Sequence, residues 1–347
     1  MLDHYANECN IAYMKFTVNE NNRRRSMSFL LALTTSFLLF LLLTGCEILV
    51  IGHPFNSDPS VNLFGGDSPN QQPQPLPIYM VDIPAGRFQR DGQEENISNV
   101  SAFRISRHEI TRHQFAQVMG TDPSEEDAST GTPDDPAQMV NWYHAIAFCN
   151  KLSLQEGLEV VYTVDGIDDW QNLQFSQIPT DDEDAWNTVA ANWDANGYRL
   201  PTEMEWLWAA TGAYQDLLNS FSGEINTGVH QKNFAGYNGT NTYEEYAWGS
   251  NNANSSTHPA GTKIPNELGL FDMTGNVSEW CWDWYAAYPD GEQNDYRGPS
   301  ATTTRVIRGS NFGNGDQGFF FVNRQEAADS IPHVQSHFRG MRIAQNP

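Results

Sequence analysis

The feature that most limits what this chain can fold into is the point at which its apolar pattern begins. From Ile78 to the C-terminus, short apolar segments alternate with Gly and Asn over about 270 residues, with no second linker between them. This length suits one large domain, residues 78–347, better than two. Neither helical nor strand periodicity is sustained for long, so we expect an α+β fold with few regular elements and many loops.

Local signals predict where the first regular elements lie. Residues 78–81 have the apolar, β-favouring composition of a strand, and Pro84-Ala85-Gly86 predicts a turn after it. Thr111 is then a suitable N-cap, because apolar residues at helical spacing follow it. We therefore expect a strand, a turn and a first helix in this order.

Two further helices are indicated by the sequence. A helix that starts near Asn141 and ends at Gly157 would place Cys149 on its apolar face, which predicts a core residue rather than a reactive thiol. Thr202 and Glu205 have the spacing of a capping box, in which each residue bonds the other's backbone N–H. The clearest helix of the chain is therefore expected to begin after Thr202.

The N-terminal part has the pattern of a bacterial lipoprotein signal. An apolar run, residues 29–43, follows three arginines and ends in Leu43-Thr44-Gly45-Cys46, which resembles a lipobox. Small residues before the cysteine admit the signal peptidase, and the thiol accepts a diacylglyceryl group. We expect residues 1–45 to be removed and Cys46 to be lipidated, so that the protein is anchored to a bacterial membrane, at the outer membrane or cell surface. The alternative is an uncut signal anchor.

The segments around this signal carry two further expectations. The stretch before Arg23 is long for a signal, so the true start is expected at Met14 or Met27. Residues 46–77 contain six prolines among Gly, Asn, Ser and Gln, without a sustained apolar period. This composition is typical of a flexible tether between the lipid and the folded domain.

Charge and cysteine content narrow the possible partners. The chain has a formal net charge of −24, and residues 1–45 contain four basic and three acidic residues, so the remainder carries −25. Such a surface repels phosphate backbones, which excludes nucleic acid as a partner. Cys149 and Cys281 are the only cysteines beyond Cys9 and Cys46, too few for a disulfide framework.

Several motifs in a fixed order carry a family resemblance. Residues 199–206 read RLPTEMEW and resemble the RLPTEAEWE signature of the formylglycine-generating enzyme family, the sulfatase-modifying factor domains. This resemblance implies a C-type-lectin-like α+β fold over residues 78–347 with few regular elements and many loops. The other matching segments are 83–86, 109–111, 136–142, 266–277, 305–310 and 339–342.

The resemblance does not extend to the chemistry of the family enzymes. Formylglycine generation needs copper held by two cysteine thiolates in the C-terminal segment. No cysteine follows Cys281, and Ser278 stands where the family's GNxWEW motif has a tryptophan. We therefore expect no copper and no oxidase activity, with a formylglycine-generating oxidase as the alternative. In the two possible registers the family's cysteines fall at Gly313 and Gly318, or at Asn314 and Phe319.

The C-terminal segment, residues 305–347, keeps the family pattern at its ends and departs from it inside. It resembles the variable proteins of diversity-generating retroelements, among them surface lipoproteins on this fold, whose terminal segment forms a ligand surface. Three consecutive phenylalanines, 319–321, cannot all be buried in an alternating strand, so at least one is expected to be exposed. The alternatives are a loop-rich core that buries all three, and ordinary divergence of a lost active site. The expected ligand-binding residues are Asn311, Phe312, Asn314, Asp316, Gln317, Phe319, Phe321, Asn323, His333, Gln335 and His337.

Calcium is the only cofactor that the resemblance implies. One family site maps onto the side chains of Asp272 and Glu279 and the backbone oxygens of Gly275 and Val277. Asn233 and Phe234 match part of a second site. Such oxygen ligands suit Ca²⁺, whose expected role is to hold loops in place.

Three functions remain to be distinguished. The first is a lipid-anchored binding protein whose C-terminal surface holds a protein or glycan ligand. The second is the oxidase, and the third is a structural lipoprotein that acts as an envelope scaffold. The sequence favours the first.

Overall fold

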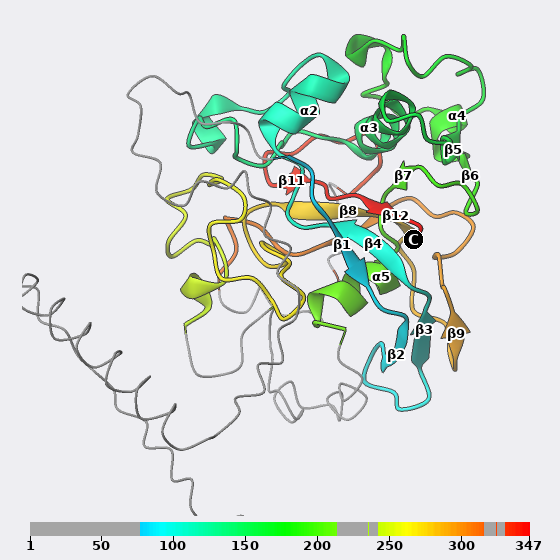
Figure 1. Ribbon diagram of the computed structural model, residues 1–347, viewed down its shortest axis with the longest axis vertical. Helices are drawn as coiled ribbons and strands as arrows, with labels where there is room; N and C mark the ends of the chain where they lie inside the picture. Colours follow the sequence, from blue (N-terminus) through cyan, green and yellow to red (C-terminus); the bar gives the residue numbers. More distant parts are fainter. Residues whose placement is uncertain (1–76, 214–234, 236–241, 316–323, 325–329) are drawn as a thin grey trace, which may run out of the picture. The chain divides into compact units, whose positions relative to one another are not determined.

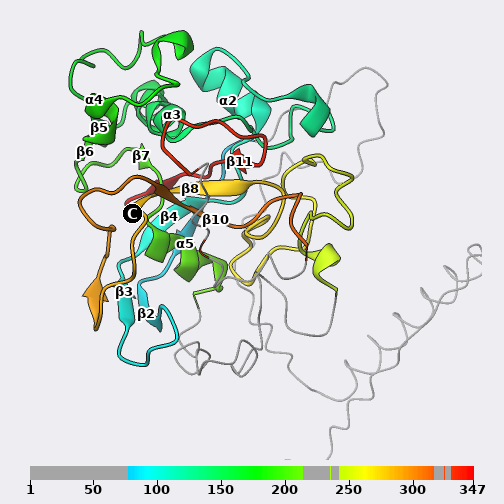
Figure 2. The same cartoon turned by 180° about the vertical axis from the view of Figure 1, so that it is seen from behind.

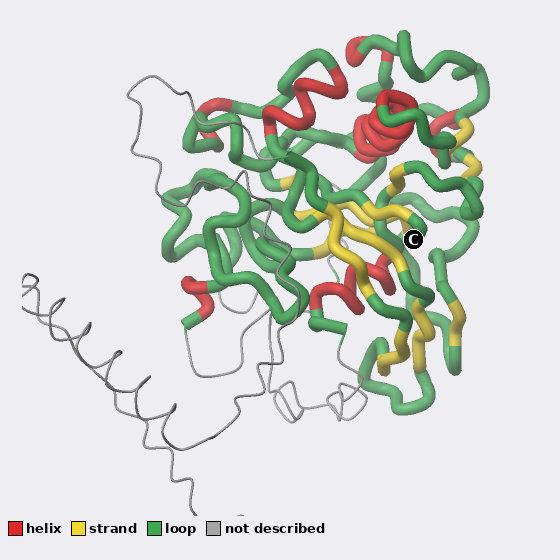
Figure 3. Tube along the Cα trace, in the orientation of Figure 1, coloured by secondary structure: helices red, strands yellow, loops and turns green. Residues whose placement is uncertain are grey.

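The computed structural model describes residues 77–213, 235, 242–315, 324 and 330–347 (Figure 1). The chain divides into two compact units, Met1–Asn70 and Gln71–Pro347, and all described residues belong to the second. This unit mixes short helices and strands with many loops (Figure 3), as the sequence predicts. Among these residues no helix is long and apolar enough to span a membrane.

The longer helices begin at residues that bond their own first turn. Thr111 caps α2 (Arg112–Met119), Asn141 caps α3 (Trp142–Gln155) and Thr202 caps α5 (Glu203–Ala210). Each of the three forms a capping box with the residue three positions later, which satisfies backbone N–H groups that a helix start leaves open. The three predicted helix starts are confirmed. The short helical turns are α4 (Asp184–Asn187), Glu126–Ala128, Phe175–Gln177 and Tyr243–Glu245.

A four-stranded sheet joins the two ends of the domain. Its order is β1 (Met80–Ile83), β4 (Phe103–Ser106), β12 (Ala344–Gln345) and β7 (Tyr198–Arg199), all antiparallel. The predicted first strand is present and begins two residues later than expected. The C-terminal residues thus pair with strands near the start of the domain.

A second sheet packs its first strand against α5. It contains β2 (Gly86–Gln89), β3 (Ile97–Val100) and β9 (Gln293–Asn294). Gly86 follows the predicted turn, and a Cβ atom there would lie 2.1 Å from the Trp208 ring. Only glycine permits this approach of strand and helix. A further pair consists of β5 (Tyr162–Thr163) and β6 (Ala190–Ala191).

The third sheet positions the C-terminal segment. Its central strand β8 (Ser278–Trp284) pairs with β10 (Arg305–Arg308) on one side and with β11 (Arg339–Gly340) on the other. Arg308 lies opposite Glu279, and Arg339 lies opposite Ser278. The intervening residues, 309–338, therefore leave and re-enter the sheet at the same end of β8.

Two apolar clusters form the core. One contains the buried faces of α2 and α3, where Phe115 and Phe148 stack with centroids 5.4 Å apart. The other contains α5 with residues of β1, β2, β3 and β4. Figures 1 and 2 show α2 and α3 on one side of the central strands and α5 on the other. Cys149 is fully buried in the first cluster, which confirms its predicted core position, and Cys281 is buried in the second; both are free thiols.

Candidate functional site

Two arginine–glutamate ion pairs connect the segments that carry the family-like motifs. In α5, Glu205 accepts two hydrogen bonds of 2.7 Å from Arg199, and in β8, Glu279 pairs with Arg342. Each pair joins segments that are held by different elements. The arginines and glutamates of the motifs therefore have a structural role, because they hold these segments together.

Glu203 anchors the C-terminal segment. Its carboxylate is completely buried and pairs with Arg308 and with Arg324, whose Nε and Nη2 each donate a 2.6 Å hydrogen bond. Burial alone would raise the pKa of Glu203, but the two guanidinium groups outweigh burial and hold this pKa below its usual value. The Tyr288 hydroxyl also donates to this carboxylate at 3.0 Å. Arg324, in the middle of the segment, is thereby fixed to α5.

The first position of each register in which the family's cysteines would fall, Gly313 or Asn314, lies in a turn close to Ser278. Asn311 donates a 3.1 Å hydrogen bond to the hydroxyl of Ser278, the residue that replaces the motif's tryptophan. A Cβ atom at Gly313 would lie 2.8 Å from a Phe338 ring carbon. A cysteine at Gly313 would therefore require Phe338 to move.

A small apolar cluster packs against the turn at residues 310–314. Phe312, Ala128 and Ala253 are buried in it, and Trp248 and Phe338 pack against it while staying partly exposed. Phe312 is only 3% exposed and its ring centroid lies 4.9 Å from that of Phe338. The prediction that Phe312 contacts a ligand is therefore corrected: this side chain supports the loop from inside.

The loop above the cluster is fixed by its own asparagines. The Asn314 side chain accepts from the Asn311 N–H at 3.0 Å, and the Asn311 side chain accepts from the Gly313 N–H at 2.9 Å. Asn311 is 9% exposed, whereas Gly313 is exposed and Asn314 is half-buried. Of the predicted ligand residues at this turn, Asn314 is thus the one whose side chain is partly open to solvent.

The three predicted polar residues in the loop before β11 have different neighbours. His337 is 41% exposed and lies 3.7 Å from the Glu125 carboxylate, with its ring stacked 6.1 Å from Phe312. Gln335 donates a 2.7 Å hydrogen bond to the Met139 carbonyl. His333 is 22% exposed and lies 3.8 Å from Asp182. The structure brings His337 to the apolar cluster, whereas His333 and Gln335 lie toward the start of α3.

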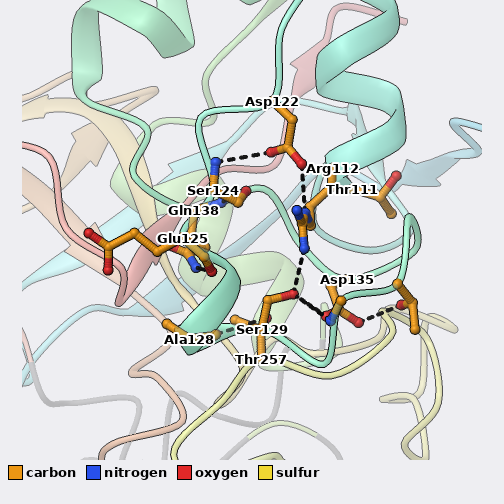
Figure 4. Close-up of polar contacts among 12 residues, drawn as sticks. Thr111, Arg112, Asp122, Ser124, Glu125, Ala128, Ser129, Asp135, Gln138 and Thr257 are labelled. Carbon is orange, nitrogen blue, oxygen red and sulfur yellow. Dashed lines mark hydrogen bonds and ion pairs between the residues drawn. The ribbon is translucent and has the colours of Figure 1, made fainter.

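A polar network holds the neighbouring loop, residues 122–139, in position (Figure 4). Arg112 donates to Asp122 at 2.7 Å and to the Ser129 hydroxyl at 2.8 Å. Asp135 is fully buried and accepts hydroxyl hydrogen bonds from Ser129, Thr130 and Thr132. These hydrogen bonds satisfy the buried Asp135 carboxylate and hold the loop in place beside residues 330–338, where the Met139 N–H donates to the Ser336 carbonyl at 3.0 Å.

We define the candidate face as the partly exposed residues that surround the apolar cluster. The Ser250 N–H donates to the Asn314 carbonyl at 2.9 Å, which places the Trp248 loop beside the turn. Trp248 stacks on His258 at 3.8 Å, and Lys263 lies 3.6 Å from its centroid. No periodicity or motif in the sequence singles out Trp248 or Phe338. The candidate face consists of Trp248, Gly313, Asn314, His337 and Phe338.

The remaining predicted positions cannot be placed on this face. They lie outside the described residues and stay predictions. They are the ligand residues Asp316, Gln317, Phe319, Phe321 and Asn323, the calcium residues Asn233 and Phe234, and the lipidated Cys46.

Of the two predicted calcium-binding side chains of the first site, Asp272 suits a cation and Glu279 does not. Asp272 is buried, and its Oδ1 has no hydrogen-bond partner among the described residues, which is compatible with a cation ligand. Both oxygens of Glu279, however, accept from Arg342, at 2.6 and 2.7 Å, and Trp206 donates to one of them at 2.7 Å. With its carboxylate neutralised by a guanidinium, Glu279 does not fit as a calcium ligand, and calcium stays a proposal that rests on Asp272.

Replacing Asp272 tests this proposal. Burial raises the pKa of Asp272 to about 6 from its usual 3.8, so an ionised Asp272 destabilises the fold as the pH rises through this interval. Without a bound cation, we expect Asp272→Asn to stabilise the protein by about 1–3 kcal/mol at pH 7 and to have little effect near pH 4. Urea denaturation at both pH values measures this, in EGTA and in calcium. Destabilisation of the variant in calcium alone would instead support a bound ion.

Comparisons with known proteins agree with the motifs. The profile of the sulfatase-modifying factor enzyme 1-like domain matches residues 66–347. The chaperone protein LppX of Paenibacillus barcinonensis is 33% identical over 237 residues, which cover 63% of this chain and 75% of LppX. The formylglycine-generating enzyme of Thermomonospora curvata is 27% identical over 319 residues, 82% of this chain and 99% of the enzyme.

One solved structure matches this chain over most of its length. Treponema denticola variable protein 1 superposes with a TM-score of 0.67 and 34% sequence identity, covering 77% of this chain and 95% of that protein. The resemblance to the sulfatase-modifying factor domains and the likeness to a variable protein are both confirmed.

Proposed function

Since the chain belongs to the family of sulfatase-modifying factor enzyme 1-like domains, we propose that it is a surface lipoprotein that binds a protein or glycan ligand. The ligand binds at the candidate face and at the adjoining C-terminal segment. Lipid on Cys46 anchors the protein to the outer membrane or cell surface, and the tether lets the domain reach its ligand.

The observation that carries this proposal is the turn at residues 310–314. Where the family's oxidases need two thiolates, the described part of this turn has a glycine against Phe338 and asparagines that bond one another. The fold that would position a copper centre instead holds a partly exposed aromatic and polar surface, which is the mixture found at protein interfaces.

The excursion of the C-terminal segment also supports ligand binding. Because β10 and β11 flank the same end of β8, residues between them that make no buried contact, unlike Phe312 and Arg324, can change in sequence without altering the sheet that holds them. The likeness to a variable protein supports diversification of this segment by a retroelement. Sequencing the neighbouring DNA tests this: we expect a reverse transcriptase gene and an imperfect repeat of the 3′ coding sequence.

The relative named as a chaperone favours a protein as the ligand. Separate measurements test the two alternative functions, oxidase and scaffold. A copper titration that shows stoichiometric binding would favour the oxidase. Co-purification of envelope proteins that is insensitive to changes at the candidate face would favour a scaffold.

A change of charge at the candidate face tests the binding function. We expect His337→Glu to reduce ligand capture at least tenfold, because this side chain is 41% exposed on the face and is not part of the core. Capture is quantified from host and bacterial extracts with the purified protein on beads, and thermal melting checks that the fold is kept. Gln171→Lys changes the charge at an exposed position that is not part of the candidate face, and it serves as the control. Equal capture by both variants would contradict the proposed face.

A further inference from the structure

Arg305 is buried without an acidic partner in the part of the chain that the structure describes. The side chain is 1% exposed, and no carboxylate of the described residues lies within ion-pair distance of its guanidinium. This distinguishes it from Arg199, Arg308 and Arg342, each of which pairs with a glutamate. A buried guanidinium that lacks a counter-charge is costly, so its environment requires an explanation.

Tryptophan rings cover both faces of this guanidinium. Its central carbon lies 3.6 Å from the Trp142 ring centroid and 3.5 Å from that of Trp284. These cation–π contacts offset part of the cost of burial, but they leave the edge of the group to donate hydrogen bonds. Among the described residues only the Trp282 carbonyl accepts one, from Nη1 at 2.6 Å, and the Nε–H has no partner.

Arg305 is one of the residues that line a cavity, whose lining also includes the exposed Ser300 and Ala301. The cavity has a volume of about 360 Å³, within the range of small-molecule sites. Trp282 and Trp284 form an aromatic wall, and Pro299, Ser300 and Ala301 form the mouth. This combination provides a flat apolar surface beside a single uncompensated positive charge, in a protein whose net charge is strongly negative.

We propose that this cavity binds a ring compound that carries a carboxylate. The ligand's carboxylate lies against Arg305 and supplies the negative charge that the guanidinium lacks. The ring lies against Trp282 and Trp284. A carboxylate matches the planar donor edge of a guanidinium better than a neutral hydroxyl does. Two sources share this chemistry: an acidic sugar such as a uronic acid, and a free aromatic acid.

Calorimetric titration with matched acid and neutral ligands tests the proposal. The probes are glucuronate and benzoate, with glucose and benzyl alcohol as their neutral counterparts, and quenching of tryptophan fluorescence gives a second readout. We expect at least one acid to bind at least tenfold more tightly than its neutral counterpart. Binding of glucuronate would identify a glycan component as the source, and binding of benzoate alone would identify a free acid.

A substitution at the mouth locates the binding site without disturbing the core. Ala301 is exposed, so Ala301→Glu adds a negative charge beside the cavity while the fold is kept. We expect it to weaken acid binding at least tenfold, whereas Ala287→Glu, at an exposed position that does not line the cavity, leaves binding unchanged. The proposal is overturned if neither acid binds at millimolar concentration, if the neutral ligands bind equally well, or if Ala301→Glu has no effect.

Discussion

Glu279→Gln is expected to cost about 3–5 kcal/mol of the free energy of unfolding. Glu279 and Arg342 are both completely buried, and their side chains share two hydrogen bonds of 2.6 and 2.7 Å. A glutamine keeps the shape of the side chain but leaves the Arg342 charge without compensation. Because that charge cannot reach water in the folded state, nearly the whole cost appears as lost stability.

The remaining contacts of Arg342 explain why its guanidinium should stay buried when Glu279 is replaced. Its Nη1 donates to the Ser106 carbonyl and its Nη2 to the Phe271 carbonyl, at 3.0 and 2.9 Å. These bonds tie the C-terminal segment to β4 and to the loop before β8. Releasing the guanidinium would therefore break the connection between two sheets.

Urea denaturation followed by tryptophan fluorescence measures this loss. Asp82→Asn is the matched control, because it removes the exposed Arg104–Asp82 pair, whose carboxylate side chain is 91% exposed, and should change stability by less than about 0.5 kcal/mol. The loss caused by Glu279→Gln should be the same in EGTA and in calcium, because the ion pair with Arg342 needs no metal. If EGTA removed the difference in stability between Glu279→Gln and the wild type, Glu279 would be a calcium ligand and the ion-pair explanation would fail.

Cys46→Ala is expected to abolish lipid attachment completely. Cys46 is the only cysteine at the end of the apolar run, and the acyl chains need its thiol. Because a single cysteine carries both acyl chains of the anchor, no partial attachment should remain. Labelling of cells with a palmitate analogue and fractionation of membranes measure the loss.

The control for this experiment is a second cysteine in the same chain. Cys149→Ala removes a thiol that is buried in the core, so it should alter stability and leave labelling intact. Labelling of the Cys46→Ala protein at the wild-type level would show that the lipid is elsewhere. Retention of that variant in the membrane without label would instead indicate an uncut signal anchor.

The helix starts could be predicted because their causes are local. Thr111, Asn141 and Thr202 each bond a residue three positions later, and such spacing is visible in the sequence. The predicted first strand was displaced by two residues, because its pairing with β4, and not its composition, sets where it begins. The family resemblance likewise needed only the order of the motifs.

The partners of the charged side chains could not be predicted in the same way. Glu203 and Glu205 lie two positions apart in one motif, yet they bind arginines from different parts of the chain. The same holds for Phe312, which the sequence placed at the surface and which Phe338 and the alanines beneath it bury. Composition shows that a residue is aromatic, but the neighbours that cover it come from other segments.

The sequence by itself determined the family, the three helix starts and the lack of any cysteine after Cys281, because each depends on residues close together or on residue identity alone, and the lipoprotein signal stays a prediction from the same source. Only the tertiary structure decided that Arg342 takes the carboxylate expected to bind calcium, that Arg324 is held by α5, and that Arg305 has no acidic partner among the described residues. These outcomes depend on which side chains the sheets bring within hydrogen-bond distance, and in a buried environment that proximity decides whether a charge is compensated.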